Sequence, residues 1–308
     1  MKAIHKNRKL REIQKHISFF THDTPSKIHI MNIDFIVDSV KFGLKISGLG
    51  KIAYENAKKV KVRDISFSFH DLPDAFNGYK ILFISDFHID GMNPLCDILL
   101  ETIKPLSYDL CLWGGDYRFL TRGNVEECIS RLSRLVELLK RKSPIMAILG
   151  NHDEYEIGEA IDNLGVSMLV NENRKVNRGG ESIYICGVDD CHYYAAHDFT
   201  ETESGIPDDG FKILLSHSPE LYADAESRGY KLYLAGHTHA GQLCLPGGIP
   251  VICEAHVPRR MIFDSWAFKT LQGYTSAGAG TSGTPGRFNS SSEVVIIELK
   301  KTERENET

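Results

Sequence analysis

Five short motifs between residues 86 and 239 carry aspartate, asparagine and histidine side chains in patterns suited to metal binding. In chain order they are Asp86-x-His88, Gly115-Asp116, Gly150-Asn151-His152-Asp153, Ser216-His217 and Gly236-His237-Thr238-His239. Carboxylate, imidazole and amide donors of this kind accept Mn, Fe or Zn. Two such ions about 3.5–4 Å apart provide the nucleophilic hydroxide and the positive charge that hydrolysis of a phosphate ester requires. The ordered set therefore predicts a two-metal phosphoesterase site, although any one motif alone is more often a turn with a hydrogen-bonded histidine.

Each motif follows a short apolar run bounded by turn-forming or polar residues. The runs cover residues 79–84, 110–113, 145–149, 213–215 and 232–234. Runs of this length and composition are typical of buried strands. Because the carboxyl ends of neighbouring strands in a layered α/β protein meet at one rim, ligands spread over about 150 residues of sequence can converge there.

The segments between the motifs divide into helices, loops and one apolar stretch. Periodic apolar residues predict helices at 125–139 and 156–164. Turn-forming residues predict loops at 171–180 and 201–210. The apolar stretch at 243–266 directly follows the last motif. It is either a hairpin that caps the core or, if the substrate carries acyl chains, part of the groove that holds them.

The order of the motifs resembles that of the calcineurin-like metallophosphoesterases, which carry Asp-x-His, Gly-Asp, Gly-Asn-His-Asp/Glu, His and Gly-His-x-His. With its flanking strands, the resemblance covers roughly residues 75–300. It implies an α/β fold of four layers, α-β-β-α, with two mixed β-sheets between helices. It also implies hydrolysis of a phosphodiester or pyrophosphate bond.

The resemblance assigns a role to each motif residue, with Asp116 bridging two divalent ions, Mn first and Fe or Zn as alternatives. The first ion would be held by Asp86, His88, Asp116 and His239, and the second by Asp116, Asn151, His217 and His237. In catalysis, Asn151 would help to stabilise the growing negative charge. His152 would protonate the departing oxygen.

Two further features of the sequence restrict the kinds of phosphate ester that the chain is expected to hydrolyse. Protein Ser/Thr phosphatases carry Asp-Arg three and four residues after the bridging aspartate, where this chain has Phe119 and Leu120. Phosphoprotein phosphatase activity is therefore not expected. Residues 114–117, 187–190, 236–242 and 287–289 are similar to the bacterial membrane-associated phosphodiesterases, a subgroup similar to the chlamydial-type UDP-2,3-diacylglucosamine pyrophosphatase of lipid A synthesis.

That subgroup implies cleavage of UDP-2,3-diacylglucosamine to UMP and 2,3-diacylglucosamine 1-phosphate. A soluble phosphodiesterase acting on cyclic nucleotides or small diesters is the alternative. A scaffold that has lost its chemistry is the remote one, because all five motifs are intact.

Four residues outside the metal set are expected to contact substrate. Arg118 and Arg287 could bind phosphate through two N–H groups each, although solvated surface arginines are the alternative. Asp190 and His192 follow the apolar run 183–186 and could reach the rim, although Asx-type turn bonds would equally explain the aspartate.

Three acidic residues are expected to have structural roles. Asp153 and Glu154 are predicted to cap the helix that follows them, where negative charge is favourable. Glu254 and His256 are expected to form a hydrogen-bonded structural pair.

Charge separates an N-terminal arm from the rest of the chain. Residues 1–63 contain 14 Lys and Arg against five Asp and Glu, a net +9, which leaves −14 for the remainder because the total is −5. An acidic catalytic body disfavours a nucleic-acid partner. A basic arm suits an anionic membrane surface.

The arm itself reads as a basic segment followed by an amphipathic helix at 33–52, with a helix docked on the core as the alternative. No apolar run approaches the roughly 18–20 residues of a membrane span, and the first residues lack the pattern of a signal peptide. Seven cysteines without a Cys-x-x-Cys pair favour a reducing cytoplasm. The expected domains are thus the arm and its helix at 1–63, a catalytic domain at 64–303 and a polar tail at 304–308, in the cytoplasm or on the inner face of its membrane.

Overall fold

The computed structural model describes residues 8–12, 46, 48–120, 125–251 and 255–303. Most of the predicted helix at 33–52, Glu254 and the tail at 304–308 lie outside the described residues. Within them, no helix combines the length and the apolar character needed to cross a bilayer.

Two six-stranded sheets form the centre of the molecule. In spatial order the first contains β1 (Lys61–Phe69), β14 (Glu293–Lys301), β2 (Tyr79–Ile84), β3 (Leu110–Trp113), β4 (Ile145–Ala147) and β5 (Ser167–Met168). The second contains β12 (Asp264–Phe268), β13 (Leu271–Thr275), β9 (Leu232–Ala235), β8 (Phe211–Leu215), β7 (Glu181–Gly187) and β6 (Glu172–Arg178). Both sheets are mixed, since β14 is antiparallel to β2 in the first, and β12 and β6 are antiparallel to their neighbours in the second.

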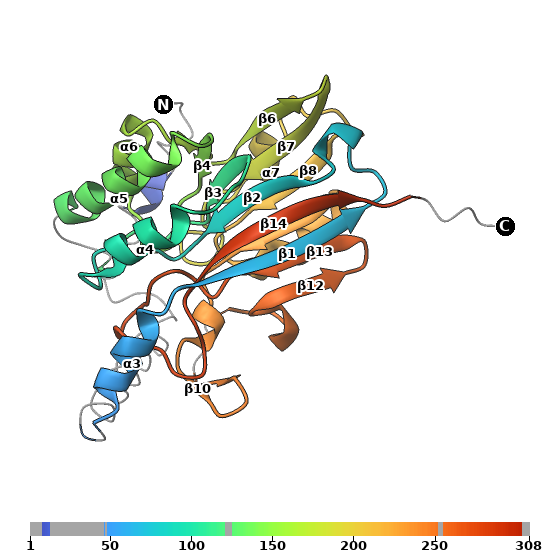
Figure 1. The fold of residues 1–308 in the computed structure, drawn as a ribbon. Helices are drawn as coiled ribbons and strands as arrows, with labels where there is room; N and C mark the ends of the chain where they lie inside the picture. Colours follow the sequence, from blue (N-terminus) through green and yellow to red (C-terminus); the bar gives the residue numbers. More distant parts are fainter. Residues whose placement is uncertain (1–7, 13–45, 47, 121–124, 252–254, 304–308) are drawn as a thin grey trace.

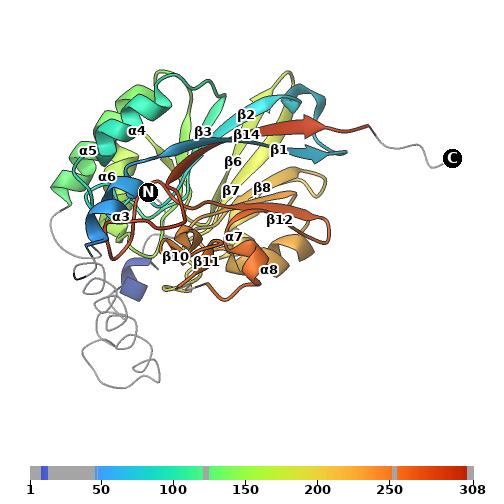
Figure 2. The same ribbon diagram turned by 60° about the horizontal axis from the view of Figure 1, so that its bottom comes forward.

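Helices cover the outer faces of the two sheets (Figures 1 and 2). α4 (Leu95–Ile103), α5 (Glu126–Leu139) and α6 (Tyr155–Asn163) pack on the first sheet, and α7 (Phe199–Thr202) and α8 (Tyr222–Ser227) on the second. A third apolar core lies between the sheets, with side chains from β2, β3 and β14 facing those from β7, β8 and β9. The expected four-layer α-β-β-α architecture is therefore confirmed.

The central strands are apolar along their whole length because they are covered on both faces. β3 is fully buried, and β2 exposes only Lys80. Such continuous apolar runs are what a parallel sheet between two layers requires. The five strand predictions at 79–84, 110–113, 145–149, 213–215 and 232–234 match β2, β3, β4, β8 and β9 to within two residues.

The prediction of a loop at 171–180 is wrong, because β6 occupies Glu172–Arg178 and pairs along its length with β7. β6 is an edge strand with no fully buried side chain, and only Val176 packs towards the inter-sheet core. Its polar sequence therefore resembles a loop. The loop predicted at 201–210 is interrupted only by the last two residues of α7.

The N-terminal boundary predicted at 63/64 falls inside β1, which pairs in parallel with β14 from Lys61 onwards. The preceding helix α3 (Gly50–Ala57) rests on the molecule through Ala53 and Ala57, both buried. The arm thus ends in a helix that contacts the catalytic core, and its division from the catalytic domain remains a prediction.

Two short elements follow the last motif. The strands β10 (Cys244–Leu245) and β11 (Ile249–Pro250) pair as a hairpin, as the first of the two readings of 243–266 expects. The 3₁₀ turns η1 (Asp74–Phe76), η2 (Pro219–Leu221), η3 (His239–Gly241) and η4 (Arg259–Met261) and a helical segment at residues 8–12 complete the described elements.

Candidate metal centre

The five motif loops leave the carboxyl ends of β2, β3, β4, β8 and β9, and all of these strands are parallel to a neighbour in this set. Asp86, Asp116, His217 and His237 lie two or three residues past their strands, and Asn151 lies four past β4. Short connections of this kind leave little freedom in where each side chain can lie. The two sheets therefore bring the motif residues to one rim.

One cluster combines Asp86, His88 and His239, whose ligand atoms lie within 4.8 Å of one another. Nε2 of His239 is 3.2 Å from Nε2 of His88 and 3.4 Å from Oδ1 of Asp86. All three side chains are buried. Two imidazole nitrogens and a carboxylate oxygen that face one small space are a suitable donor set for a divalent cation.

Asp116 lies between this cluster and a second one. Its Oδ2 is 3.5 Å from Nε2 of His88 and 3.3 Å from Nε2 of His217. It also belongs to a potential metal-binding group with Asp86 and His217, and to another with His88 and His152. A single carboxylate within reach of both histidines has the position that a bridging ligand needs.

The second cluster continues through His237 and Asn151. Nδ1 of His237 is 2.9 Å from Oδ1 of Asn151. Nε2 of His217 and Nε2 of His237 are buried and have no hydrogen-bond partner among the described residues. Buried polar atoms are normally paired, and a bound cation would satisfy these nitrogens. The residues present thus fit two divalent ions.

Backbone carbonyls orient two of the imidazoles. Nδ1 of His88 donates to the carbonyl of Arg118 at 2.5 Å, and Nδ1 of His217 donates to that of Gly114 at 2.8 Å. A hydrogen bond at one ring nitrogen fixes the tautomer and turns the other nitrogen towards the ion. Nε2 is therefore the atom that both residues would offer to an ion.

Burial and neighbouring charge set the protonation of the metal-free site. Burial lowers the pKa of His88 to about 3 and holds the pKa of His237 and His239 well below the ordinary value. Burial alone would raise the pKa of Asp116, but His217 and other histidines around it hold that pKa well below the usual range. In return Asp116 outweighs the effect of burial on His217 and raises its pKa to about 10. An ion that binds here has to displace the His217 proton.

The backbone at the site is held in the left-handed region at five expected ligands. The φ angles are 52° at Asp86, 37° at His88, 57° at Asp116, 70° at His237 and 51° at His239. Non-glycine residues in this conformation are strained by about 1–3 kcal/mol each, and such strain gathers at functional sites. The surrounding contacts must therefore compensate for it.

The motif glycines make room for carboxylates. A Cβ on Gly236 would lie 2.0 Å from Oγ of Ser85 and 2.2 Å from Oδ2 of Asp86. A Cβ on Gly150 would lie 2.1 Å from Oδ1 of Asp116. Only glycine permits so close an approach of backbone to carboxylate.

Asp153 is not the helix cap that the sequence predicts. Its buried carboxylate accepts hydrogen bonds from the backbone N–H groups of Asp116, Tyr117 and Gly150 at 2.7–2.8 Å. The prediction is wrong for Asp153, which instead joins the loops that carry Asp116 and Asn151. Glu154 does occupy the N-cap position of the helix α6, where its charge is favourable, but makes no side-chain capping bond.

The alternative of solvated surface arginines is also wrong. Arg287 is fully buried and donates to the carbonyls of His239 at 3.0 Å, Ala277 at 2.5 Å and Gly280 at 2.7 Å. Arg118 is buried as well, with Nη1 3.3 Å from Oε2 of Glu154. Arg287 therefore holds the loop of His239, a role that its sequence context does not signal.

Asp190 and His192 differ in their relation to the site. Oδ2 of Asp190 accepts from the N–H groups of Tyr193 and Tyr194 at 2.7 and 2.6 Å, which is a turn-stabilising arrangement. The ring of His192 lies 4.3 Å from that of His237, and its Nδ1 is 3.0 Å from the Glu220 carboxylate. The structure thus brings His192 to the rim, whereas the carboxylate of Asp190 is used in hydrogen bonds within its own loop.

Glu220 was missed by the sequence analysis. It accepts the backbone N–H of His256 at 2.8 Å in addition to the His192 contact. Burial would raise its pKa, but the hydrogen bonds from His192 and His256 lower that pKa to about 2. A glutamate two residues after the His217 and Ser218 pair carries no sequence signal of this role.

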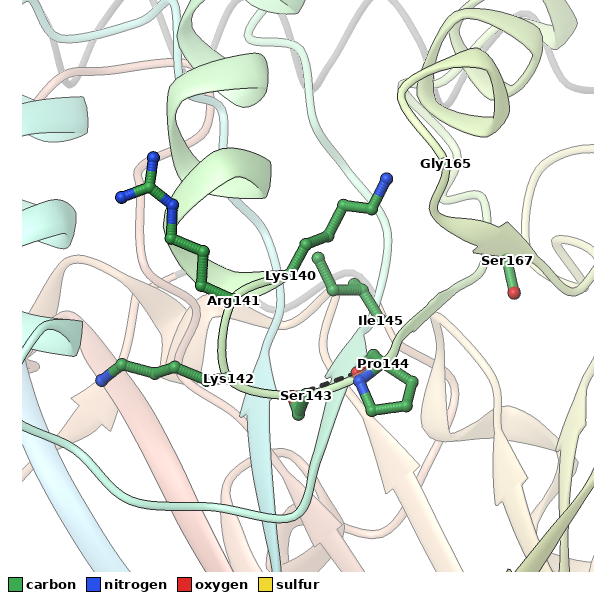
Figure 3. Close-up of a pocket in the computed structure, with 8 residues that line it drawn as sticks. All are labelled: Lys140, Arg141, Lys142, Ser143, Pro144, Ile145, Gly165 and Ser167. Carbon is green, nitrogen blue, oxygen red and sulfur yellow. Dashed lines mark hydrogen bonds between the residues drawn. The ribbon is translucent and has the colours of Figure 1, made fainter.

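A separate pocket of about 330 Å³ opens at the amino end of β4, whereas the metal-site loop follows the carboxyl end of this strand (Figure 3). Lys140 donates to the carbonyl of Leu164 at 2.9 Å, and Lys142 to that of Lys104 at 2.6 Å. Both ammonium groups thus pair with carbonyls at the ends of α6 and α4.

The two sheets and the converging donors together define the class of a metal-dependent hydrolase of phosphate esters. The chain belongs to the calcineurin-like phosphoesterase family, whose model matches residues 79–258.

Three relatives illustrate this membership. An uncharacterised metallophosphoesterase of Bacillus subtilis, YkuE, is 26% identical over 265 residues, which cover 83% of this chain and 91% of the relative. Phosphodiesterase YaeI of Escherichia coli is 28% identical over 237 residues, with 72% and 82% covered. A zebrafish (Danio rerio) transmembrane protein with a metallophosphoesterase domain is 29% identical over 265 residues, which are 80% of this chain but 58% of that protein.

Replacement of Gly236 by alanine tests the need for close approach at Asp86. The added Cβ would overlap Oδ2 of Asp86, so we expect Gly236→Ala to weaken Mn²⁺ binding and to lower activity about 10-fold or more. Gly205→Ala is the control, because nothing lies within 4 Å of its Cβ, and its positive φ, which Gly236 does not share, makes it no milder a change to the backbone. Calorimetric Mn²⁺ titration of both variants decides, and equal affinities would contradict the steric explanation.

Proposed function

We propose that this chain is a two-metal phosphodiesterase in which Asp116 bridges the ions. The observation that carries the proposal is that one oxygen, Oδ2 of Asp116, lies within 3.5 Å of histidines from both clusters. The remaining ligands would be Asp86, His88 and His239 on the first ion and Asn151, His217 and His237 on the second. Mn is the first choice and Fe or Zn the alternative. The E. coli relative is named a phosphodiesterase, which supports cleavage of a diester bond.

Bound ions would supply an activated water and positive charge for the phosphoryl oxygens. The side chain of His152 would protonate the leaving group. Nδ1 of His152 donates to the carbonyl of Phe119 at 3.1 Å, which leaves Nε2 to exchange a proton with the leaving group. The backbone N–H of His152 donates to Oδ1 of Asp116 at 2.9 Å, so the two residues are held in one arrangement. Asn151 would stabilise charge beside them.

Two substitutions separate metal binding from proton transfer. We expect Asp116→Ala to lose bound metal and nearly all activity, because both clusters lose their shared carboxylate. His152→Ala should keep its metal and lose about 10²–10⁴-fold in kcat, the usual contribution of a general acid. Metal content by mass spectrometry and turnover of an aryl phosphodiester measure these effects. A His152→Ala variant with the wild-type kcat would refute the role of His152.

We further propose that the substrate is UDP-2,3-diacylglucosamine, hydrolysed to UMP and 2,3-diacylglucosamine 1-phosphate. The support from sequence is the resemblance of residues 114–117 and 236–242 to the bacterial membrane-associated phosphodiesterases, a subgroup similar to the pyrophosphatase that acts on this lipid. The support from structure is a group of exposed apolar side chains. Leu245, Ile249 and Val251 on the β10–β11 hairpin are 47–55% exposed.

Similar exposed side chains are those of Leu49, the N-cap of helix α3, and of Ile52 within the helix, at 41% and 51%. One segment connects the two elements, because the N–H of Arg287 donates to the carbonyl of Ala53 and the N–H of Cys244 donates to that of Phe288, both at 2.9 Å. The helix and the hairpin project from the same end of the molecule (Figures 1 and 2).

This apolar surface is joined to the metal centre. The guanidinium of Arg287 holds the carbonyl of His239, while the backbone of the same residue contacts α3. Acyl chains bound on the hairpin and α3 would leave the pyrophosphate of the same molecule near His239. A small soluble diester would make no use of these side chains.

Phosphorus NMR of the Mn-loaded protein with UDP-2,3-diacylglucosamine in detergent tests the substrate. We expect UMP and the acylated sugar 1-phosphate to form with the wild type and not with Asp116→Ala. Turnover of a simple aryl phosphodiester in parallel shows whether the enzyme is active. An active enzyme that leaves the lipid intact would reject this substrate and favour soluble diesters such as cyclic nucleotides.

We propose in addition that the same surface attaches the protein peripherally to an anionic membrane, since Lys51 on α3 and Lys59 just after this helix are exposed. The double substitution Ile249→Asp and Val251→Asp should reduce sedimentation with phosphatidylglycerol vesicles, because carboxylates resist insertion. Val62→Asp, at a similarly exposed apolar residue on β1, should sediment like the wild type. Equal sedimentation of all three proteins would remove the membrane proposal.

A further inference from the structure

Arg8 is an arginine from the N-terminal segment that is buried against the 150–153 loop of the metal centre, only 1% exposed. Its Nη1 donates to Oδ1 of Asp189 at 2.5 Å, and its Nε donates to Oε1 of Glu12 at 3.0 Å. The guanidinium lies over the ring of Tyr194, 3.5 Å from the centroid. The side chain is therefore fixed by charge, hydrogen bonds and stacking together.

The other terminal nitrogen of Arg8 faces the metal-site loop. Nη2 donates to the carbonyl of Asp153 at 2.6 Å and to that of Gly150 at 3.1 Å. These two carbonyls flank Asn151 and His152 in the sequence. One nitrogen thus holds both ends of the four-residue stretch that contains them.

Glu12, one helical turn after Arg8, extends the contact. Its Oε1 accepts the backbone N–H of Tyr155 at 2.8 Å, at the start of α6. Arg11 donates to the carbonyl of Tyr194 at 3.0 Å, on the loop that also carries His192. The segment 8–12 therefore contacts two loops of the rim, the one at 150–155 and the one at 189–195.

The backbone of the 150–153 loop is held from both sides. The carboxylate of Asp153 accepts the N–H of Gly150, whereas Arg8 binds the carbonyls of Gly150 and Asp153. Buried backbone groups in a loop must find partners outside regular structure, and here an acidic and a basic side chain divide the task. Removal of Arg8 would leave two buried carbonyls to find other donors.

We propose that Arg8 is a positioning residue of the hydrolytic reaction, which holds Asn151 and His152 at the metal centre through the carbonyls of Gly150 and Asp153. The inference rests on the roles proposed above for Asn151 and His152. A guanidinium is required rather than a positive charge alone, because one planar group must reach Asp189, Glu12 and both carbonyls at once.

Three variants and one control test the role of Arg8. Arg8→Ala removes all contacts, and Arg8→Lys keeps the charge without the planar fork. Arg8→Ala combined with Asp189→Asn removes the charge imbalance without restoring the carbonyl contacts. Arg141→Ala is the matched control. Arg141 is an exposed arginine at the pocket by the amino end of β4, opposite the end that leads to the metal-site loop (Figure 3). The readouts are kcat and KM for an aryl phosphodiester with saturating Mn²⁺, and Mn²⁺ affinity by titration.

We expect Arg8→Ala and Arg8→Lys to lower kcat about 10- to 100-fold, or Mn²⁺ affinity by a similar factor, as loss of a partner behind a metal ligand usually does. KM should change less. The double variant should remain as slow as Arg8→Ala, and Arg141→Ala should match the wild type.

Wild-type kcat and Mn²⁺ affinity in Arg8→Ala would overturn the proposal. Recovery of both in the double variant would also overturn it, because Arg8 would then only balance the charge of Asp189. Should Arg8→Ala fail to fold, Arg8→Lys decides by the same criteria. If the wild type itself does not cleave the diester, the proposed function fails, and the Mn²⁺ titration still tests the positioning of Asn151.

Discussion

Three backbone N–H groups that meet on the carboxylate of Asp153 hold the metal-site loops in one arrangement. Two belong to the loop after β3, at Asp116 and Tyr117, and one belongs to Gly150 after β4. Because Asp116 is the carboxylate shared by both clusters, its place relative to Asn151 depends on this connection. Burial raises the pKa of Asp153 to about 6, while the N–H donors act in the opposite direction. The N–H donors around this buried carboxylate therefore limit how far burial raises its pKa.

The strands determine which loops can meet, but the loops determine the geometry. Parallel strands bring five carboxyl ends to one rim, and short connections then force Asp86, Asp116 and His237 into left-handed backbone conformations. Conformations of this kind persist only where other contacts compensate for them. The Asp153 carboxylate and the guanidinium of Arg287 supply such contacts, and the glycines before the ligands remove the steric obstacle.

Much of the fold was predictable from sequence, because the central strands are apolar along their length and the motifs follow them directly. The residues that support the site were not. Asp153 lies inside a motif, and the helix that begins after it offered a simpler explanation. Arg8 and Arg287 contact loops about 140 and 50 residues away in sequence, and no local pattern signals such contacts. The strand β6 was mistaken for a loop because an edge strand has few apolar residues to reveal its period.

The buried arginines also bear on how a phosphate would be recognised. Arg287 directs its terminal nitrogens to backbone carbonyls, and Arg118 pairs with Glu154, so both face protein acceptors in this structure. The charge of a bound phosphate would then be met mainly by the metal ions, with His152 beside them. An arginine that bound the phosphate directly would stabilise substrate and transition state alike, whereas ions at the reacting phosphorus act most strongly on the charge that develops there. Arg8 and Arg287 use their guanidinium groups to fix loops, and the proposed metal ligands would then determine the chemistry.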